Sequence, residues 1–145
     1  MLVLRPDFEK RGGLVTVVAQ DAATLDVLMV AYTDEAGWRN TLETGLATYY
    51  STSRKESWVK GETSDNRQRV VGMRIDCDGD ALIYFVEPQG HRLACHLDSR
   101  SCFAIDIQGN FLMDIGKMHE RMELGYLDVA INESFKRMAL YEPSC

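Results

Sequence analysis

The sequence predicts an α+β fold with a mainly antiparallel, barrel-like sheet at its core and a few helices. Three observations lead to this prediction. Short apolar segments with many β-branched residues recur along the chain and are typical of strands. One amphipathic helical pattern falls between two of them, and a longer helical stripe occupies the C-terminal part.

The expected strands follow one another closely along the chain. They are residues 14–20, 27–32, 47–51, 70–75, 81–86, 93–95 and 102–107. A turn is expected at 21–26 between the first two, which indicates a hairpin. The polar stretch 52–69 is rich in Arg, Lys, Ser and Thr, and we expect a functional loop with short pieces of strand.

A helix is expected from about Asp34 to Thr44. Thr33 is the candidate N-cap, acidic residues fill the first turn, and Gly45 stands just past the end. The residues expected to face inward are Trp38, Leu42 and Thr41.

The length and charge of the chain limit its class. Its 145 residues fit one domain with a small appendage. We expect a main domain over residues 1–110 and a helical extension over 111–145. The net charge of −6 argues against binding to a nucleic acid polymer. The N-terminus does not resemble a signal peptide and no apolar run could span a bilayer, so we expect a cytoplasmic protein without a membrane partner.

The acidic segment Asp76-Cys77-Asp78-Gly79-Asp80 is a candidate metal site. If the segment is extended, its three carboxylates project to one face and Cys77 projects to the other. Carboxylates held together repel one another unless a cation lies between them, and oxygen ligands suit Mg²⁺. The alternative is a solvated acidic turn between two strands. An EF-hand is excluded because residues 81–86 have a strand pattern where its loop would continue.

Three cysteines form a second candidate site. Cys77, Cys95 and Cys102 lie within 26 positions of one another. In a chain without an export signal, clustered cysteines are more often metal ligands or catalytic groups than disulfides. Three thiolates leave one tetrahedral position open, as in catalytic zinc sites. Burial as small core residues is the alternative, and Cys145 is expected to be a free thiol without a role.

Four segments have the order and character of a known family's motifs. They are residues 58–64 (Trp-Val-Lys-Gly-Glu-Thr-Ser), 76–80, 94–96 (Ala-Cys-His) and 100–103 (Arg-Ser-Cys-Phe). Together with residues 27–32 and 41–45, they resemble the phosphoribosyl-AMP cyclohydrolase family of histidine biosynthesis. The resemblance covers roughly residues 13–107.

The resemblance implies a zinc-dependent hydrolase that opens the adenine ring of phosphoribosyl-AMP at the N1–C6 bond. It implies an intertwined homodimer with Zn²⁺ at the subunit interface and Mg²⁺ nearby. The implied zinc ligands are Cys95 and Cys102, with Cys77 coming from the other subunit. The implied Mg²⁺ ligands are Asp76, Asp78 and Asp80. Zinc lowers the pKa of bound water to near 7, which supplies a nucleophile for C6.

His96 is the candidate for proton transfer, because imidazole titrates near neutrality and the residue adjoins Cys95. A structural histidine is the alternative. Other residues have the chemistry to bind the phosphates of a small nucleotide substrate, although such a loop is usually only a solvated surface. They are Arg54, Lys55, Lys60, Thr63, Ser64 and Arg100.

Some positions depart from the family pattern. Thr52 stands where the family has arginine, and Asp65 and Asp98 stand where it has glycine. Asn66 and Leu97 replace a histidine and a threonine of the pattern. These changes make the substrate loops less attractive to two phosphates. A paralogue that uses the same chemistry on another purine-like or amidine heterocycle is therefore an alternative. A non-catalytic metal-binding protein is disfavoured, because every ligand and His96 are retained.

Overall fold

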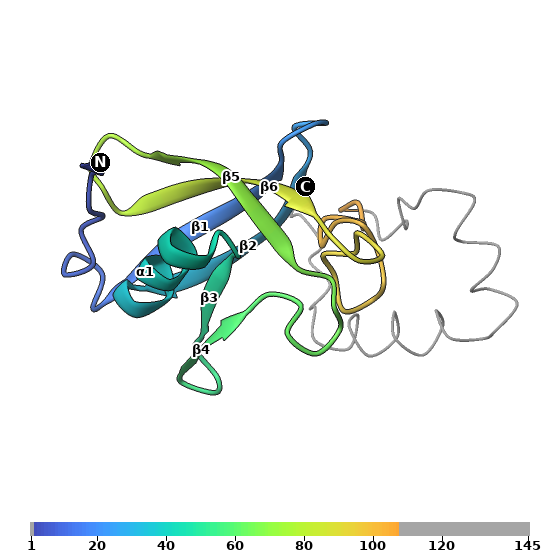
Figure 1. Cartoon of the computed structure of the whole chain (residues 1–145), viewed down its shortest axis with the longest axis horizontal. Coiled ribbons are helices and arrows are strands. Elements are labelled where there is room, and N and C mark those ends of the chain that lie inside the picture. The colour runs from blue at the N-terminus through green and yellow to red at the C-terminus, as the bar shows by residue number, and fades with distance from the viewer. Residues whose placement is uncertain (1, 108–145) are drawn as a thin grey trace, which may run out of the picture. The chain divides into compact units, whose positions relative to one another are not determined.

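Six strands form a single curled sheet in the computed structural model, which describes residues 2–107. The strands are β1 (Leu14–Asp21), β2 (Val27–Asp34), β3 (Thr48–Ser51), β4 (Glu56–Val59), β5 (Gln68–Ile75) and β6 (Ala81–Pro88). Their order across the sheet is β4-β3-β2-β1-β6-β5 (Figure 1). Contacts divide the chain into two compact units, Met1–Phe103 and Ala104–Cys145, and the fold described here is that of the first.

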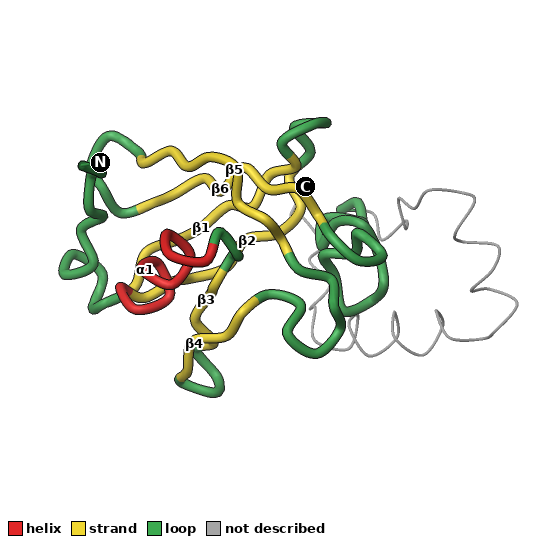
Figure 2. The backbone as a smooth tube through the Cα atoms, viewed as in Figure 1, coloured by secondary structure: helices red, strands yellow, loops and turns green. Residues whose placement is uncertain are grey.

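The sheet is mixed but mainly antiparallel. Among the described strands, only β1 and β6 pair in parallel; the remaining neighbours are antiparallel. The Ala47 amide donates to the Gln68 carbonyl at 2.9 Å, and the Val70 amide donates to the Gly45 carbonyl at 2.8 Å. These bonds join the segment before β3 to the start of β5, so the sheet curls back on itself (Figure 2). The predicted strand-rich α+β fold is confirmed.

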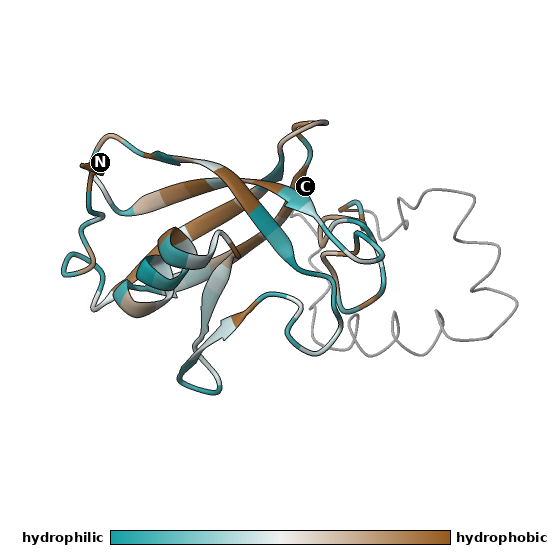
Figure 3. Ribbon diagram, viewed as in Figure 1, coloured by the Kyte–Doolittle hydropathy of each residue, from teal (hydrophilic) through white to brown (hydrophobic). Residues whose placement is uncertain are grey.

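The core lies on one face of the central strands. Val15, Val17 and Ala19 of β1 are fully buried and alternate with half-buried residues, as the period of a strand requires. Tyr84 and Val86 of β6 are also fully buried. Figure 3 shows the hydrophobic residues concentrated along these central strands.

The helix α1 (Glu35–Thr44) begins one residue later than predicted. Its N-cap is Asp34, whose carboxylate accepts a 2.8 Å hydrogen bond from the Gly37 amide. Thr33, the expected N-cap, is fully buried and its hydroxyl donates to the Thr48 carbonyl instead. Gly45 ends the helix with φ of 72°, a left-handed conformation that glycine adopts without strain.

Two of the three residues expected to face inward from α1 do so. Trp38 and Thr41 are buried, and the Trp38 ring lies 5.9 Å from the ring of Phe8, centroid to centroid. Leu42 is 42% exposed, so its predicted burial is wrong. The remaining helical prediction, for residues 111–145, lies outside the described residues, as does Cys145.

The expected strands at 93–95 and 102–107 do not form. Residues 94–103, which we call the cysteine loop, fold back on themselves. The Ala94 amide donates to the Arg100 carbonyl at 3.3 Å, and the Cys95 amide donates to the Ser99 carbonyl at 3.2 Å. These local bonds use backbone groups that a sheet ladder would need. Within residues 2–107, no helix is long and apolar enough to cross a membrane.

Candidate functional site

A cavity of about 490 Å³ lies between the cysteine loop and the connection from β4 to β5. Seven of the predicted site residues line it: Arg54, Lys60, Thr63, Ser64, Cys95, His96 and Cys102. Met29, Trp58, Asn66 and Asp98 are among the other lining residues. Residues far apart in the sequence are thus gathered around one hollow with polar and apolar lining residues, and a concave site of this kind is usual for small molecules.

Cys95 and Cys102 form a pair at this cavity. The Cys102 amide donates to the Leu28 carbonyl of β2 at 2.7 Å, and the Asp98 amide donates to the Cys95 carbonyl at 3.0 Å. Both cysteines carry free thiols. A side-chain hydrogen bond from Cys102 lowers the pKa of Cys95 to about 5. Cys95 therefore favours the thiolate, which is the form that binds metals.

Lys60 is a cation held close to these thiols. Its residue is only 9% exposed, and burial lowers the pKa of its ammonium group. The sulfurs of Cys102 and Cys95 act in the opposite direction and favour the charged ammonium. By reciprocity, the ammonium favours thiolates. The Lys60 amide donates to the Ala47 carbonyl at 2.9 Å, which fixes its backbone to the sheet.

Gly61 allows the loop after Lys60 to close around the cavity. Its φ is 81°, and a Cβ there would meet the backbone carbon of Asn66 at 2.3 Å. A larger residue would therefore have to move the backbone at Asn66 and Arg67, which closes the loop that contains Thr63 and Ser64. Glycine is required at position 61 because the backbone of Asn66 approaches it closely.

His96 lies on the exposed side of the same cavity. It follows Cys95 directly, so the turn that places the thiol also places the imidazole. The structure brings together two thiols, an imidazole and a buried ammonium. Two neighbouring thiols fit a thiophilic ion such as Zn²⁺, although they are fewer than the three or more protein ligands of a usual zinc site.

The three aspartates are clustered, but not for the predicted reason. Residues 76–80 form the turn between β5 and β6 and are not extended. The Asp76 carboxylate accepts hydrogen bonds from the amides of Asp80 (3.0 Å) and Ala81 (3.1 Å). One carboxylate oxygen from each of Asp76, Asp78 and Asp80 lies within 4.8 Å of the others. The cluster could hold a metal ion, whereas the alternation argument that predicted it is wrong.

Two cations from the N-terminal segment contact this cluster, and no local pattern predicted them. Lys10 forms ion pairs with Asp78 and, at 3.1 Å, with Asp80. Arg11 pairs with Asp80 at 2.7 Å. A hydrogen bond from Arg11 lowers the pKa of Asp80, and a hydrogen bond from Lys10 lowers it to a smaller extent. The Asp7 amide donates to the Gly79 carbonyl at 2.8 Å and so holds the segment against the turn.

Cys77 is not brought to the cavity within one chain. It is exposed on the β5–β6 turn, while the cysteine loop follows the far end of β6 (Figure 1). At about 3.3 Å per residue, the eight residues of β6 separate these two ends by roughly 25 Å. Cys77 can therefore join the other two cysteines only if it comes from another copy of the chain.

Comparison with known proteins decides the family. A family model for phosphoribosyl-AMP cyclohydrolase matches residues 29–104. The chain belongs to the phosphoribosyl-AMP cyclohydrolase family. The phosphoribosyl-AMP cyclohydrolase of Desulfatibacillum aliphaticivorans is 49% identical over 111 residues, which are 77% of this chain and 88% of that protein. That of Archaeoglobus fulgidus is 52% identical over 98 residues, covering 68% of this chain and 89% of that protein.

A third relative is longer. The histidine biosynthesis bifunctional protein HisIE of Aquifex aeolicus is 54% identical over 98 residues, which are 68% of this chain but 47% of that protein. The predicted family is confirmed. So is the enzyme class, a hydrolase that acts on a cyclic amidine C–N bond.

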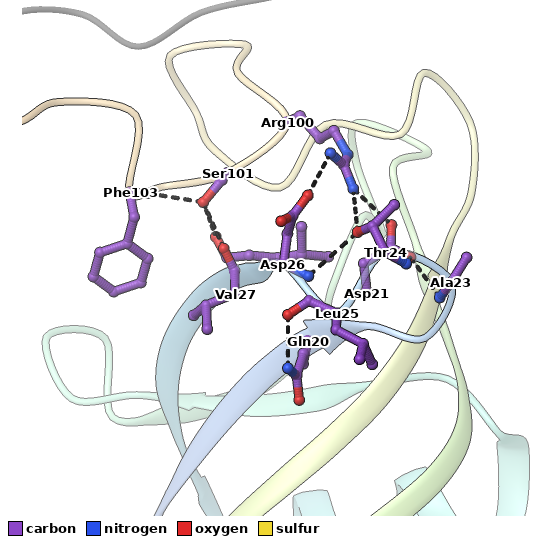
Figure 4. Close-up of polar contacts among 11 residues, drawn as sticks. Gln20, Asp21, Ala23, Thr24, Leu25, Asp26, Val27, Arg100, Ser101 and Phe103 are labelled. Carbon is purple, nitrogen blue, oxygen red and sulfur yellow. Dashed lines mark hydrogen bonds and ion pairs between the residues drawn. The ribbon is translucent and has the colours of Figure 1, made fainter.

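Two of the residues predicted to bind the phosphates, Lys55 and Arg100, are not among the residues that line the cavity. Lys55 is exposed in the turn between β3 and β4. Arg100 directs its guanidinium to Asp21 at the end of β1 and to Thr24 and Asp26 in the turn that follows (Figure 4). These contacts give no support to a role for Arg100 in binding substrate.

The departures at Asp65 and Asp98 have a backbone explanation. Their φ values are 63° and 58°, in the left-handed region where the family pattern has glycine and where aspartate is better tolerated than most residues. The Asp65 carboxylate is 77% exposed and pairs with Arg67 at 2.7 Å. Asp98 lines the cavity. Of the two added carboxylates, only that of Asp98 belongs to a cavity-lining residue.

Proposed function

We propose that the chain is a zinc-dependent phosphoribosyl-AMP cyclohydrolase that hydrolyses the N1–C6 bond of the adenine ring in histidine biosynthesis. The observation that carries this proposal is the thiol pair of Cys95 and Cys102, which lines one cavity with His96. Thiolate sulfur is a preferred zinc ligand. Membership of the family and the names of its relatives support the reaction.

The proposed active protein is a homodimer. Cys95 and Cys102 of one subunit would hold zinc with Cys77 of the partner subunit, because each subunit's own Cys77 lies at the opposite end of β6. Three thiolates leave the fourth tetrahedral position for water or substrate. The carboxylates of the β5–β6 turn would hold Mg²⁺, since oxygen ligands suit a hard cation. Mg²⁺ would have to compete there with Lys10 and Arg11.

The proposed chemistry adds water across one bond. Zinc at such a site supplies, when bound, activated water near neutral pH. Oxygen adds to C6, the C6–N1 bond breaks, and N1 receives a proton. His96 is the proposed proton carrier, because it lines the cavity beside Cys95. Arg54, Thr63 and Ser64 are proposed to bind the phosphates, with Lys60 providing further positive charge.

The test is direct. Zinc-loaded protein is incubated with phosphoribosyl-AMP, and ring opening is followed by ultraviolet absorbance. We expect turnover by the wild type, loss of activity and of bound zinc in Cys102→Ala, and loss of activity with retained zinc in His96→Asn. Absence of ring opening by the zinc-loaded wild type would contradict the proposal.

One observation favours a second candidate function. Asp98 adds a carboxylate residue to the cavity lining, which disfavours a substrate with two phosphates. The same chemistry on another purine-like or amidine heterocycle is therefore the alternative. Faster hydrolysis of an analogue that lacks one phosphate than of phosphoribosyl-AMP would identify it.

A further inference from the structure

We infer that Arg100 is a positioning residue, whose ion pairs with the β1–β2 turn hold Cys102 at the distance from Cys95 that a shared metal ion requires. The inference rests on the proposed function in treating the two thiols as zinc ligands. It assigns to Arg100 a role other than contact with substrate.

The guanidinium group of Arg100 makes three hydrogen bonds, all of them to the end of β1 and the turn that follows it. Its Nη1 lies 2.8 Å from the Asp26 Oδ2, and its Nη2 lies 2.7 Å from the Thr24 Oγ1 and 3.2 Å from the Asp21 Oδ2 (Figure 4). Asp21 is the last residue of β1, and Thr24 and Asp26 lie in the connection to β2. A planar fork with several acceptors fixes orientation as well as distance.

The turn that receives Arg100 is itself well held. The Asp21 side chain is 1% exposed, and its Oδ1 accepts hydrogen bonds from the amides of Ala23 (2.8 Å) and Thr24 (3.1 Å). The Asp21 amide donates to the Asp26 carbonyl at 2.9 Å. The flanking strands occupy the middle of the sheet. Arg100 is thus anchored to a rigid part of the fold.

The residues after Arg100 continue the attachment along β2. The Ser101 hydroxyl donates to the Val27 carbonyl at 2.7 Å and accepts from the Phe103 amide at 3.0 Å. The Cys102 amide donates to the Leu28 carbonyl at 2.7 Å. Ser101 and Cys102 are therefore attached to the start of β2, and Arg100 is attached directly before it, at Asp26.

Arg100 also reaches toward the other thiol through its backbone. Its carbonyl accepts from the Ala94 amide, directly before Cys95, and the neighbouring Ser99 carbonyl accepts from the Cys95 amide. The residue thus joins its own arm of the loop, which carries Cys102, to the arm that carries Cys95. Residues that orient metal ligands typically contribute about 10–100-fold to metal affinity.

The experiment uses Co²⁺ as a spectroscopic probe of the full-length protein. Co²⁺ affinity, the thiolate-to-cobalt absorption band and the thermal unfolding temperature are measured for Arg100→Gln, Arg100→Lys and Asp26→Asn. Arg69→Gln is the matched control, because it breaks an exposed ion pair between the edge strand β5 and Glu87 of β6. We expect Co²⁺ affinity to fall about 10–100-fold in Arg100→Gln, less in Arg100→Lys, and not at all in the control. The double variant Arg100→Gln/Asp26→Asn should bind no more weakly than Arg100→Gln.

A second measurement separates this inference from the zinc proposal. Phenylarsine oxide bridges two neighbouring thiols, so its affinity for the metal-free protein reports their spacing, with Cys102→Ser as the blank. Weaker arsenical binding in Arg100→Gln supports positioning even if the wild type binds no Co²⁺, a result that would contradict the zinc proposal alone. Unchanged arsenical and Co²⁺ binding with a raised KM for phosphoribosyl-AMP would overturn the inference and make Arg100 a substrate ligand.

Discussion

Lys60 and the two cavity thiols illustrate how neighbouring groups set each other's charge. A buried ammonium is costly unless anionic groups lie near it, and here the nearby groups are the sulfurs of Cys102 and Cys95. A thiol that donates to a neighbouring sulfur stabilises the thiolate of its partner. Charge in the cavity is thus shared among three side chains, and a change in one alters the others.

The pKa of Cys95 is therefore expected to depend on Cys102. Hydrogen bonding from Cys102 lowers it to about 5, from an ordinary value of 9.0. In Cys102→Ala the midpoint should rise toward the ordinary value, so less thiolate is present at pH 7. Alkylation of Cys95 by iodoacetamide in the metal-free protein, measured across pH by mass spectrometry, tests this. Cys77→Ala is the control and should leave the midpoint unchanged.

The two added aspartates should affect the substrate unequally. Asp98 lines the cavity, whereas Asp65 is exposed and paired with Arg67. Asp98→Gly should lower the KM for phosphoribosyl-AMP by about tenfold, equivalent to about 1.4 kcal/mol. Asp65→Gly is the matched control, because it makes the same change at another residue with positive φ. It should have little effect on the KM, because the Asp65 carboxylate is exposed and paired with Arg67. Adding Thr52→Arg should lower KM further. Steady-state kinetics in which wild type and Asp98→Gly agree would contradict the altered-pocket interpretation.

At the scale of elements, α1 and the β5–β6 turn are both set by aspartates that bond to backbone amides. Asp34 caps α1 and also accepts from the Ser57 hydroxyl of β4 at 2.9 Å. Asp76 closes the β5–β6 turn in the same way. In each case a short acidic side chain replaces backbone bonds that a helix end or turn leaves unmade.

Removal of the helix cap should destabilise the fold moderately. Asp34→Ala leaves the Gly37 amide without its acceptor and should lower the free energy of unfolding by about 0.5–2 kcal/mol. Urea denaturation followed by circular dichroism measures the change. Glu43→Ala, in the exposed last turn of α1, is the control. An equal effect in both variants would show that Asp34 is not acting as a cap.

The acidic turn gives opposite expectations for two kinds of variant. The triple variant Asp76→Asn/Asp78→Asn/Asp80→Asn should abolish Mg²⁺ binding, because it removes the anionic ligands. Lys10→Met should tighten Mg²⁺ binding, because it removes a cation that pairs with Asp78 and Asp80. Calorimetric titration with Mg²⁺ measures both changes. Absence of Mg²⁺ binding in wild type and Lys10→Met alike would identify the cluster as an acidic turn neutralised by the N-terminal segment.

For the whole molecule, the distance between Cys77 and the thiol pair makes dimerisation part of the proposed chemistry. Cys77→Ala and Cys102→Ala should each be inactive alone. Mixing the two after partial unfolding should restore one complete site per heterodimer, and therefore up to about a quarter of wild-type activity per total protein if subunits mix randomly. Analytical ultracentrifugation should show a dimer. A monomer that is active at every dilution would contradict a shared site.

The sequence by itself determined the strand-rich class, α1 and the residues around the cavity. The short apolar segments of β1 and β6 and the glycine after α1 are local signals, because strand propensity and the end of a helix depend on neighbouring residues. The motif around Gly61 and the two loop cysteines also identified most of the cavity lining without a structure.

Only the tertiary structure decided which of these residues meet. Nothing local links Asp21 to Arg100 or Lys10 to Asp78, since these pairs are 79 and 68 residues apart. The strands predicted at residues 93–95 and 102–107 do not form, because the Cys102 amide bonds to β2 and the Cys95 amide bonds within the cysteine loop. The separation of Cys77 from its two companions follows from the direction and length of β6. Local patterns fix the conformation of a segment, whereas contacts between segments depend on how the curled sheet orders its strands.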